Sequence, residues 1–204
     1  MEGTCSHDHD CGGDNDCAGS SLHAYVNHPR VTVQGAEDDA AAPRVLRAWD
    51  ERLTREGEPL RSDDDPELIL HIPFVSDVKV RGVMVIGGGN GRAPAQLKAW
   101  VNKAPGEITL DNASRRTPTQ QWDLADDPRG LLEYQTDATL FQAVSSLTLY
   151  FPTNLVGGDG GSPLEIWYIG LRGEGTANRR DMIVTAVYES KAMPQDHRTP
   201  AEDG

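Results

Sequence analysis

The stretch VKVRGVMVI at residues 78–86 decides the fold class. Val78 and Val80 alternate with Lys79 and Arg81, so apolar and charged side chains fall on opposite faces of an extended chain. A period of two is typical of a strand that is buried on one side and hydrated on the other. This stretch therefore predicts a half-buried β-strand with its bases facing water.

Similar apolar runs occur on both sides of this stretch, separated by clusters of Gly, Pro, Asp and Asn. No segment has the 3.6-residue periodicity of an amphipathic helix over more than three turns. Seven or eight short strands with turn-rich links predict an all-β fold, an antiparallel β-sandwich or jelly roll. Its core would include the inward row Leu147, Leu149 and Phe151. The runs expected to form strands are residues 67–74, 78–86, 95–102, 130–135, 144–152, 164–175 and 181–190.

Two segments interrupt the strand pattern. The glycine-rich link GGGNGR at 87–92 lacks the lysine of a phosphate-binding loop, and no helix follows it. We therefore expect a hairpin connection there. Residues 44–53 are expected to form one helical or irregular turn, with Leu46 and Trp49 anchored inward.

The sequence contains no recognisable set of catalytic residues. The motifs G-x-S-x-G and H-E-x-x-H are absent. Five residues separate each cysteine from the next, which excludes the C-x-x-C pair of thioredoxin-type redox sites. His71 lies inside a predicted strand, where we expect a buried imidazole bonded to the backbone rather than a catalytic base. The sequence therefore predicts a protein that is not an enzyme.

Composition divides the chain into one domain with polar ends. Residues 1–20 and 191–204 are nearly free of large apolar side chains, so we expect a disordered leader, a β-sandwich domain over 21–190 and a polar tail. The net charge of −13 argues against binding to nucleic acid or to an anionic membrane. With no apolar signal segment at the start of the sequence, we expect a cytoplasmic protein that also has access to the nucleus.

The leader contains the best candidates for metal ligands. Thiolates and imidazoles are the ligands that zinc prefers. Their spacing is tighter than in structural zinc sites, and no hydrophobic residue nearby would close a core over the metal. We therefore expect weak, exchanging zinc binding at most, and no built-in cofactor. The candidate ligands are Cys5, His7, His9, Cys11 and Cys17.

A basic segment stands out from the acidic chain. Residues 79–116 contain 7 basic and 2 acidic side chains. Lys79, Arg81 and Arg92 lie on the first strand face and its adjoining link, where a positive patch would suit an acidic partner surface. The alternative is that these bases only keep an exposed sheet face hydrated.

Four motifs together resemble the PITH domain, over about residues 21–198. They are WYIGLRGEGTANRR (167–180), SDDDPELILHIPF (62–74), VKVRGVMVIGG (78–88) and MPQDHR (193–198). This domain forms the C-terminal part of proteasome-interacting thioredoxin-like proteins and also occurs alone. The resemblance implies a jelly roll similar to galactose-binding domains. It also implies a non-enzymatic interaction module whose partner is the proteasome regulatory particle or another large protein assembly.

The segment IWYIGLRGEG within the first motif has a structural interpretation of its own. Arg172 and Glu174 share one strand face, where they would pair with each other or with a neighbouring strand. The glycines permit a bulge or the close approach of a neighbouring chain. These glycines are Gly170, Gly173 and Gly175.

Two classes of function stay open on sequence alone. The first is a protein-interaction module, which we expect to be monomeric. The second is a small-ligand binder of the carbohydrate-binding type, which would need aromatic platforms in its loops. The tryptophans fall mostly in predicted ordered elements, which favours the first class. They are Trp49, Trp100, Trp122 and Trp167.

Overall fold

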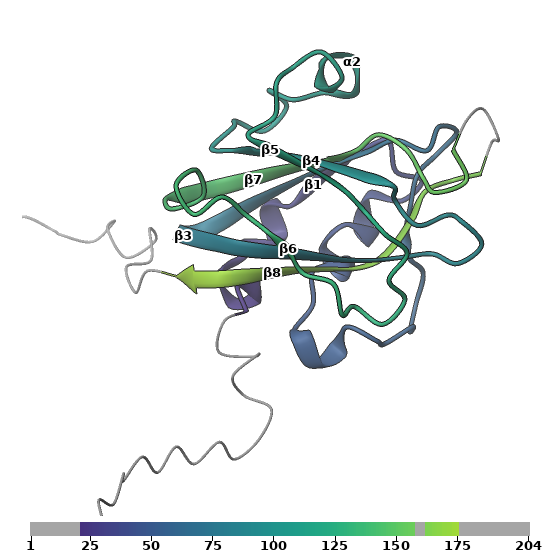
Figure 1. Ribbon diagram of the computed structural model, residues 1–204, viewed down its shortest axis with the longest axis horizontal. Helices are drawn as coiled ribbons and strands as arrows, with labels where there is room; N and C mark the ends of the chain where they lie inside the picture. The colour runs from purple at the N-terminus through teal and green to yellow at the C-terminus, as the bar shows by residue number, and fades with distance from the viewer. Residues whose placement is uncertain (1–20, 158–161, 176–204) are drawn as a thin grey trace, which may run out of the picture.

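The computed structural model describes residues 21–157 and 162–175, which form an antiparallel β-sandwich (Figure 1). The fold class predicted from the alternation at 78–86 is therefore confirmed. The strand predicted at 181–190, the leader and the polar tail lie outside the described residues.

Eight strands and six short helical segments make up the described part of the chain. The strands are β1 (Thr32–Gln34), β2 (Leu60–Arg61), β3 (Leu68–Gly87), β4 (Gln96–Val101), β5 (Gln120–Asp123), β6 (Tyr134–Gln135), β7 (Val144–Phe151) and β8 (Glu165–Gly175). The helical segments are η1 (His23–Tyr25), η2 (His28–Arg30), η3 (Asp39–Ala41), η4 (Pro43–Val45), η5 (Trp49–Glu51) and α2 (Leu110–Ala113). None of these helices is long and apolar enough to span a membrane.

β3 is shared by the two layers of the sandwich. Its first part, to Pro73, pairs with β1 and β7. Its second part, from Val78, pairs with β8, over two residues with β6, and at Val78 also with β7. The register shifts between these two parts. The prediction of separate strands at 67–74 and 78–86 is therefore wrong, because the interruption is a bulge within one strand and not a turn.

The strand order is β2-β8-β3-β7-β4-β5, with β1 and β6 also paired to β3. β7 thus lies between β3 and β4, so the hairpin predicted at 87–92 is wrong. This link instead pairs with the start of β8, because Gly88 N donates to Glu165 O and Glu165 N donates to Arg92 O, both at 2.9 Å. The strand predicted at 130–135 is confined to its last two residues.

β7 is buried on both faces. Leu147, Leu149 and Phe151 are fully buried, which confirms the predicted core row. On the other face, Thr148 and Tyr150 are each only 2% exposed. That second face is covered because the chain between β4 and β5, which contains α2, folds over it (Figure 1).

The segment predicted as one turn at 44–53 forms η4 and η5. Leu46 is buried as expected. Trp49 is only half-buried, and the Arg52 guanidinium carbon lies 3.9 Å from the centre of its ring. The inward anchor of this segment is therefore Leu46, while Trp49 contributes to the outer surface.

Candidate interaction surface

An open groove of about 280 Å³ lies where β3 passes the segment that follows β6. One side of the groove is formed by β3, with the two bases Lys79 and Arg81 flanking Val80. The other side is formed by the last residue of β6 and the irregular segment that follows it. The residues that line it there are Gln135, Thr136, Ala138, Phe141 and Gln142.

Backbone pairing fixes the two sides of this groove to each other. Thr136 donates to β3 twice, from its backbone N to Arg81 O at 3.0 Å and from its hydroxyl to Val80 O at 2.6 Å. Val80 N in turn donates to Phe141 O at 3.0 Å, and the Phe141 side chain is buried. The groove is therefore a built feature of the fold, with polar and cationic side chains at its mouth.

One carboxylate lies beside the two bases of the groove. Glu174 of β8 pairs with Arg81 and, at 3.7 Å, with Lys79. All three side chains are more than half exposed, so these ion pairs are hydrated and contribute little to stability. Among the described residues, Glu174 is the carboxylate paired with these two bases, so this set carries one positive charge in excess. Its exposed ion pairs can be exchanged for those of a partner.

Arg92, the third predicted docking residue, lies elsewhere. Its Nη1 donates to Glu165 Oε1 at 2.7 Å, and Arg61 donates to the same oxygen at 2.9 and 3.1 Å. Glu165 and Glu174 lie at opposite ends of β8, about 30 Å apart at the usual rise of an extended strand. The structure therefore brings Lys79 and Arg81 together but does not place Arg92 in the same patch.

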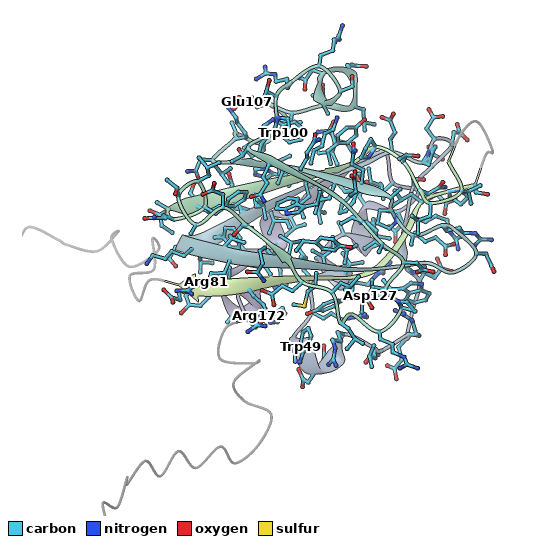
Figure 2. All side chains as sticks on the ribbon, in the orientation of Figure 1. Trp49, Arg81, Trp100, Glu107, Asp127 and Arg172 are labelled. Carbon is cyan, nitrogen blue, oxygen red and sulfur yellow. The ribbon has the colours of Figure 1, made fainter. Side chains whose placement is uncertain are left out.

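Arg172 and Glu174 pair with other residues rather than with each other. Glu174 pairs with the bases of β3, as the neighbouring-strand alternative expected. Arg172 donates to Glu133 Oε2 at 2.7 Å. A Cβ at Gly82 would overlap the Glu133 side chain, so a larger residue at position 82 would displace the Glu133 carboxylate of this ion pair. Figure 2 shows Arg81 and Arg172 near the end of β8.

His71 has no catalytic neighbour that would make it a base. It is 5% exposed, and its Nδ1 lies 3.0 Å from the Thr148 hydroxyl oxygen. Burial is therefore confirmed, but the predicted bond to the backbone is wrong, because β3 and β7 place these two side chains directly opposite each other. Burial also lowers the pKa of His71, so the imidazole is neutral at pH 7.

Residues 21–157 and 162–175 contain no group of three or more His, Cys, Asp or Glu side chains that could hold a metal ion. The zinc ligands proposed from the sequence lie outside this part of the chain. They are Cys5, His7, His9, Cys11 and Cys17. Their metal binding stays a prediction.

Sequence reasoning missed the far side of the groove. Phe141 and Gln142 come from an irregular segment, and Gln135 ends a strand of two residues, so no periodicity shows which of these side chains face outward. The one local signal is Asp137, whose carboxylate accepts from Thr139 N at 2.7 Å and so marks a turn. A turn signal predicts where the chain reverses, but not which strand it packs against.

The chain matches known proteins over most of its length. The PITH domain profile matches residues 13–192. PITH domain-containing protein 1 of Dictyostelium discoideum is 34% identical over 185 residues, covering 90% of this chain and 87% of that protein. The human protein of the same name is 30% identical over 177 residues, covering 87% of this chain and 80% of that protein.

Among solved structures, a fucose-binding module from Streptococcus pneumoniae matches with a TM-score of 0.45 and 10% identity, covering 71% of this chain and 90% of that module. At that level of similarity its ligand says nothing about this chain. The profile and the two relatives agree with the motifs in the sequence and span nearly all of its described residues. The chain belongs to the PITH domain family.

Proposed function

We propose that this chain is a non-enzymatic interaction module that docks onto a large protein assembly, the regulatory particle of the proteasome. The observation that supports docking is the groove at Lys79 and Arg81, where two exposed bases share one exposed carboxylate. The identity of the partner comes from the resemblance to the C-terminal domain of proteasome-interacting thioredoxin-like proteins. Both the cytoplasm and the nucleus would give access to such a partner.

The chemistry of the groove suits a protein surface better than a reacting substrate. It is open, and its lining combines cationic, amide and hydroxyl side chains with the edge of a buried aromatic ring. A chain of net charge −13 repels acidic surfaces in general, so a local excess of positive charge orients an acidic partner towards this groove. Exposed ion pairs at a rim of this kind affect the rate and orientation of association more than its final affinity.

The tryptophans do not favour the carbohydrate-binding alternative. Trp100 is buried, and its indole nitrogen donates to Thr117 O at 2.9 Å. Trp49 and Trp167 lie under the guanidinium groups of Arg52 and Arg55. Trp122 donates to Gln135 O at 3.0 Å and packs against the core. Each of the four rings is therefore already buried, in contact with a guanidinium group, or packed against the core.

The test is an affinity capture from cell extract at low salt, read by quantitative mass spectrometry. Full-length chain is compared with the variant Lys79→Glu/Arg81→Glu and with the matched control Arg115→Glu/Arg129→Glu. Both variants change the net charge equally, and Arg115 and Arg129 are exposed residues away from the groove. We expect regulatory-particle subunits to be enriched by the wild type and by the control, and to be depleted with the groove variant and with rising salt.

The outcomes separate the partner from the surface. If wild type enriches regulatory-particle subunits no more than an unrelated acidic protein does, the proteasome assignment is wrong. If both double variants capture these subunits as well as the wild type, the partner stands and the groove is not where it binds. Arg92 is left out of the variant, because glutamate at that position would face the buried Glu165 and disturb the fold.

A further inference from the structure

A second hollow, of about 260 Å³, lies on the outer face of the layer formed by β1, β3, β7 and β4. His71 and Pro73 of β3 and Ser146 of β7 face it from neighbouring strands, since Pro73 pairs with Ser146. The segment between β4 and β5 covers the rest of this face but stops short of this end. The hollow is therefore the uncovered end of an otherwise buried surface.

The walls of this hollow are cationic and polar. Arg30, at the end of η2, lines one side and Lys103, just after β4, lines the other. No aspartate or glutamate is among the lining residues, although the chain as a whole is strongly acidic. The complete lining is Asn27, Arg30, His71, Pro73, Phe74, Val75, Lys103, Pro105, Ser145 and Ser146.

The two cations differ in how firmly they are held. Within the described residues, the Arg30 side chain makes no ion pair or hydrogen bond, and it is exposed. Lys103 is bound at 3.0 Å to Glu107, which also receives Arg116 at 3.4 Å (Figure 2 labels Glu107). Because Arg116 remains on Glu107, Lys103 can turn towards the hollow without leaving that carboxylate unpaired.

The floor adds neutral hydrogen-bonding groups. The Nδ1 of His71 is occupied by the Thr148 hydroxyl, so Nε2 is the ring nitrogen left for a ligand. The Ser146 hydroxyl donates to Lys103 O at 2.9 Å, and the Ser145 hydroxyl donates to Asn102 Oδ1 at 2.9 Å. These bonds use the hydroxyl hydrogens, so the two serines hold the floor in place while His71 is the neutral group that can donate to a phosphate oxygen. The described lining residues include no carboxylate, and Glu107 beside Lys103 is paired with both Lys103 and Arg116.

We propose that this hollow binds the phosphate group of a small phosphorylated ligand, with Arg30 and Lys103 neutralising the phosphate and His71 hydrogen-bonding to it. A phosphate dianion matches two cations and offers more acceptor oxygens than a carboxylate does. Ligand pockets for larger organic molecules usually occupy about 300–1,000 Å³, so a hollow of this size fits a ligand no larger than a sugar phosphate. This site is separate from the groove at Lys79 and Arg81 and does not depend on the docking function.

The test is a titration of ¹⁵N-labelled full-length chain, followed by two-dimensional NMR. The probes are inorganic phosphate, glucose 6-phosphate and unphosphorylated glucose. We expect saturable shifts of the amides of Arg30, His71, Lys103 and Ser145 with glucose 6-phosphate, and no shifts with glucose. If inorganic phosphate shifts the same amides to the same extent, the hollow recognises the phosphate alone. If the ester binds more tightly, the hollow also contacts the sugar.

Variants then show whether the two cations are responsible. Arg30→Ala and Lys103→Ala should each weaken glucose 6-phosphate binding about tenfold, the effect of losing one charge-assisted hydrogen bond. The control Arg129→Ala removes an exposed arginine far along the chain and should leave the affinity unchanged. The proposal is overturned if glucose binds as well as its phosphate, if the shifts map outside the hollow, or if no probe gives saturable shifts. It is also overturned if all three variants bind alike.

Discussion

Gly173 of β8 lies so close to Lys79 of β3 that a Cβ at position 173 would overlap the Lys79 carbonyl oxygen. The obstacle is backbone, and it belongs to a paired strand, since Gly173 is opposite Val80 in the ladder. A methyl group there can be accommodated only by separating β3 from β8. We expect Gly173→Ala to lower the free energy of unfolding by about 3 kcal/mol or more, measured by urea denaturation.

The matched control is Gly89→Ala. Nothing lies within 4 Å of a Cβ at position 89, and the backbone there is not in the left-handed region. We expect a change within about 0.5 kcal/mol, as for other exposed positions without special contacts. Equal destabilisation by the two substitutions would contradict the steric explanation and point to a general sensitivity of the fold to losing glycine.

Two carboxylates on β8 allow buried and exposed ion pairs to be compared in one protein. Glu165 and Glu174 each receive two cations, but the Glu165 side chain is 8% exposed and that of Glu174 is 54% exposed. Removing the cations from the buried carboxylate leaves a charge that water cannot fully hydrate. We expect Arg61→Ala/Arg92→Ala to lower the free energy of unfolding by about 3 kcal/mol.

The companion variant is Lys79→Ala/Arg81→Ala, which takes both cations from Glu174. We expect it to cost less than about 1 kcal/mol, because that carboxylate stays hydrated. Both double variants change the net charge by the same amount, so urea denaturation of the two at one salt concentration isolates the effect of burial. Similar losses in the two variants would show that Glu165 is better hydrated than its position indicates.

The fold class can be predicted from the sequence because the burial pattern of a strand is visible in the order of its own apolar and polar residues. The alternation of Val78, Lys79, Val80 and Arg81 is reproduced in the structure, where the valines are buried and the bases exposed. From Gly82 to the end of β3 every residue is buried, and the sequence there is a continuous apolar run. Local patterns of this kind need no knowledge of the rest of the chain.

The charge environment of the bases could not be predicted in the same way. Glu174 and Glu165 neutralise part of the positive charge at Arg81 and Arg92, and each comes from a strand more than 70 positions further along the chain. The register that brings them together depends on the shift between Val80 and Gly82 in the pairing of β3 with β8. A one-residue slip would reverse the faces, and no local pattern specifies it.

The cysteine-rich leader gives a prediction about metal removal. The described core begins at Leu22, which is buried and whose N donates to Leu171 O at 2.8 Å. We expect deletion of residues 1–19, or dialysis against a strong chelator, to leave the melting temperature nearly unchanged. The measurement is differential scanning calorimetry of the full chain, the truncated chain and the chelated chain. Unfolding on chelation would make the metal structural, which contradicts weak, exchanging binding by the leader.

Two histidines predict how stability depends on pH. Burial lowers the pKa of His71, and burial together with the nearby His28 lowers the pKa of His23, against the opposing effect of Glu51. In the unfolded chain both pKa values return to about 6.5, so the unfolded state binds more protons below that pH. The free energy of unfolding should therefore be highest above about pH 7 and should fall as the pH drops through 6.5 towards the folded pKa values.

The contribution of these histidines is isolated by the variant His23→Gln/His71→Gln, whose new side chains do not titrate. Urea denaturation of wild type and variant is compared at about pH 7.5, 6.5 and 5.5, which roughly span the titration range of histidine. Because carboxylates titrate alike in both proteins, the gap between the two curves reports the histidines alone. We expect wild type to be the more stable at the highest pH, where its imidazoles are neutral and His71 keeps its bond to Thr148. The difference in free energy of unfolding between wild type and variant should shrink as the pH falls. At low pH the unfolded chain protonates both imidazoles, whereas the folded wild type resists their protonation, and this lowers the stability of the wild type. Curves that stay parallel over this range would show that neither imidazole resists protonation in the folded chain.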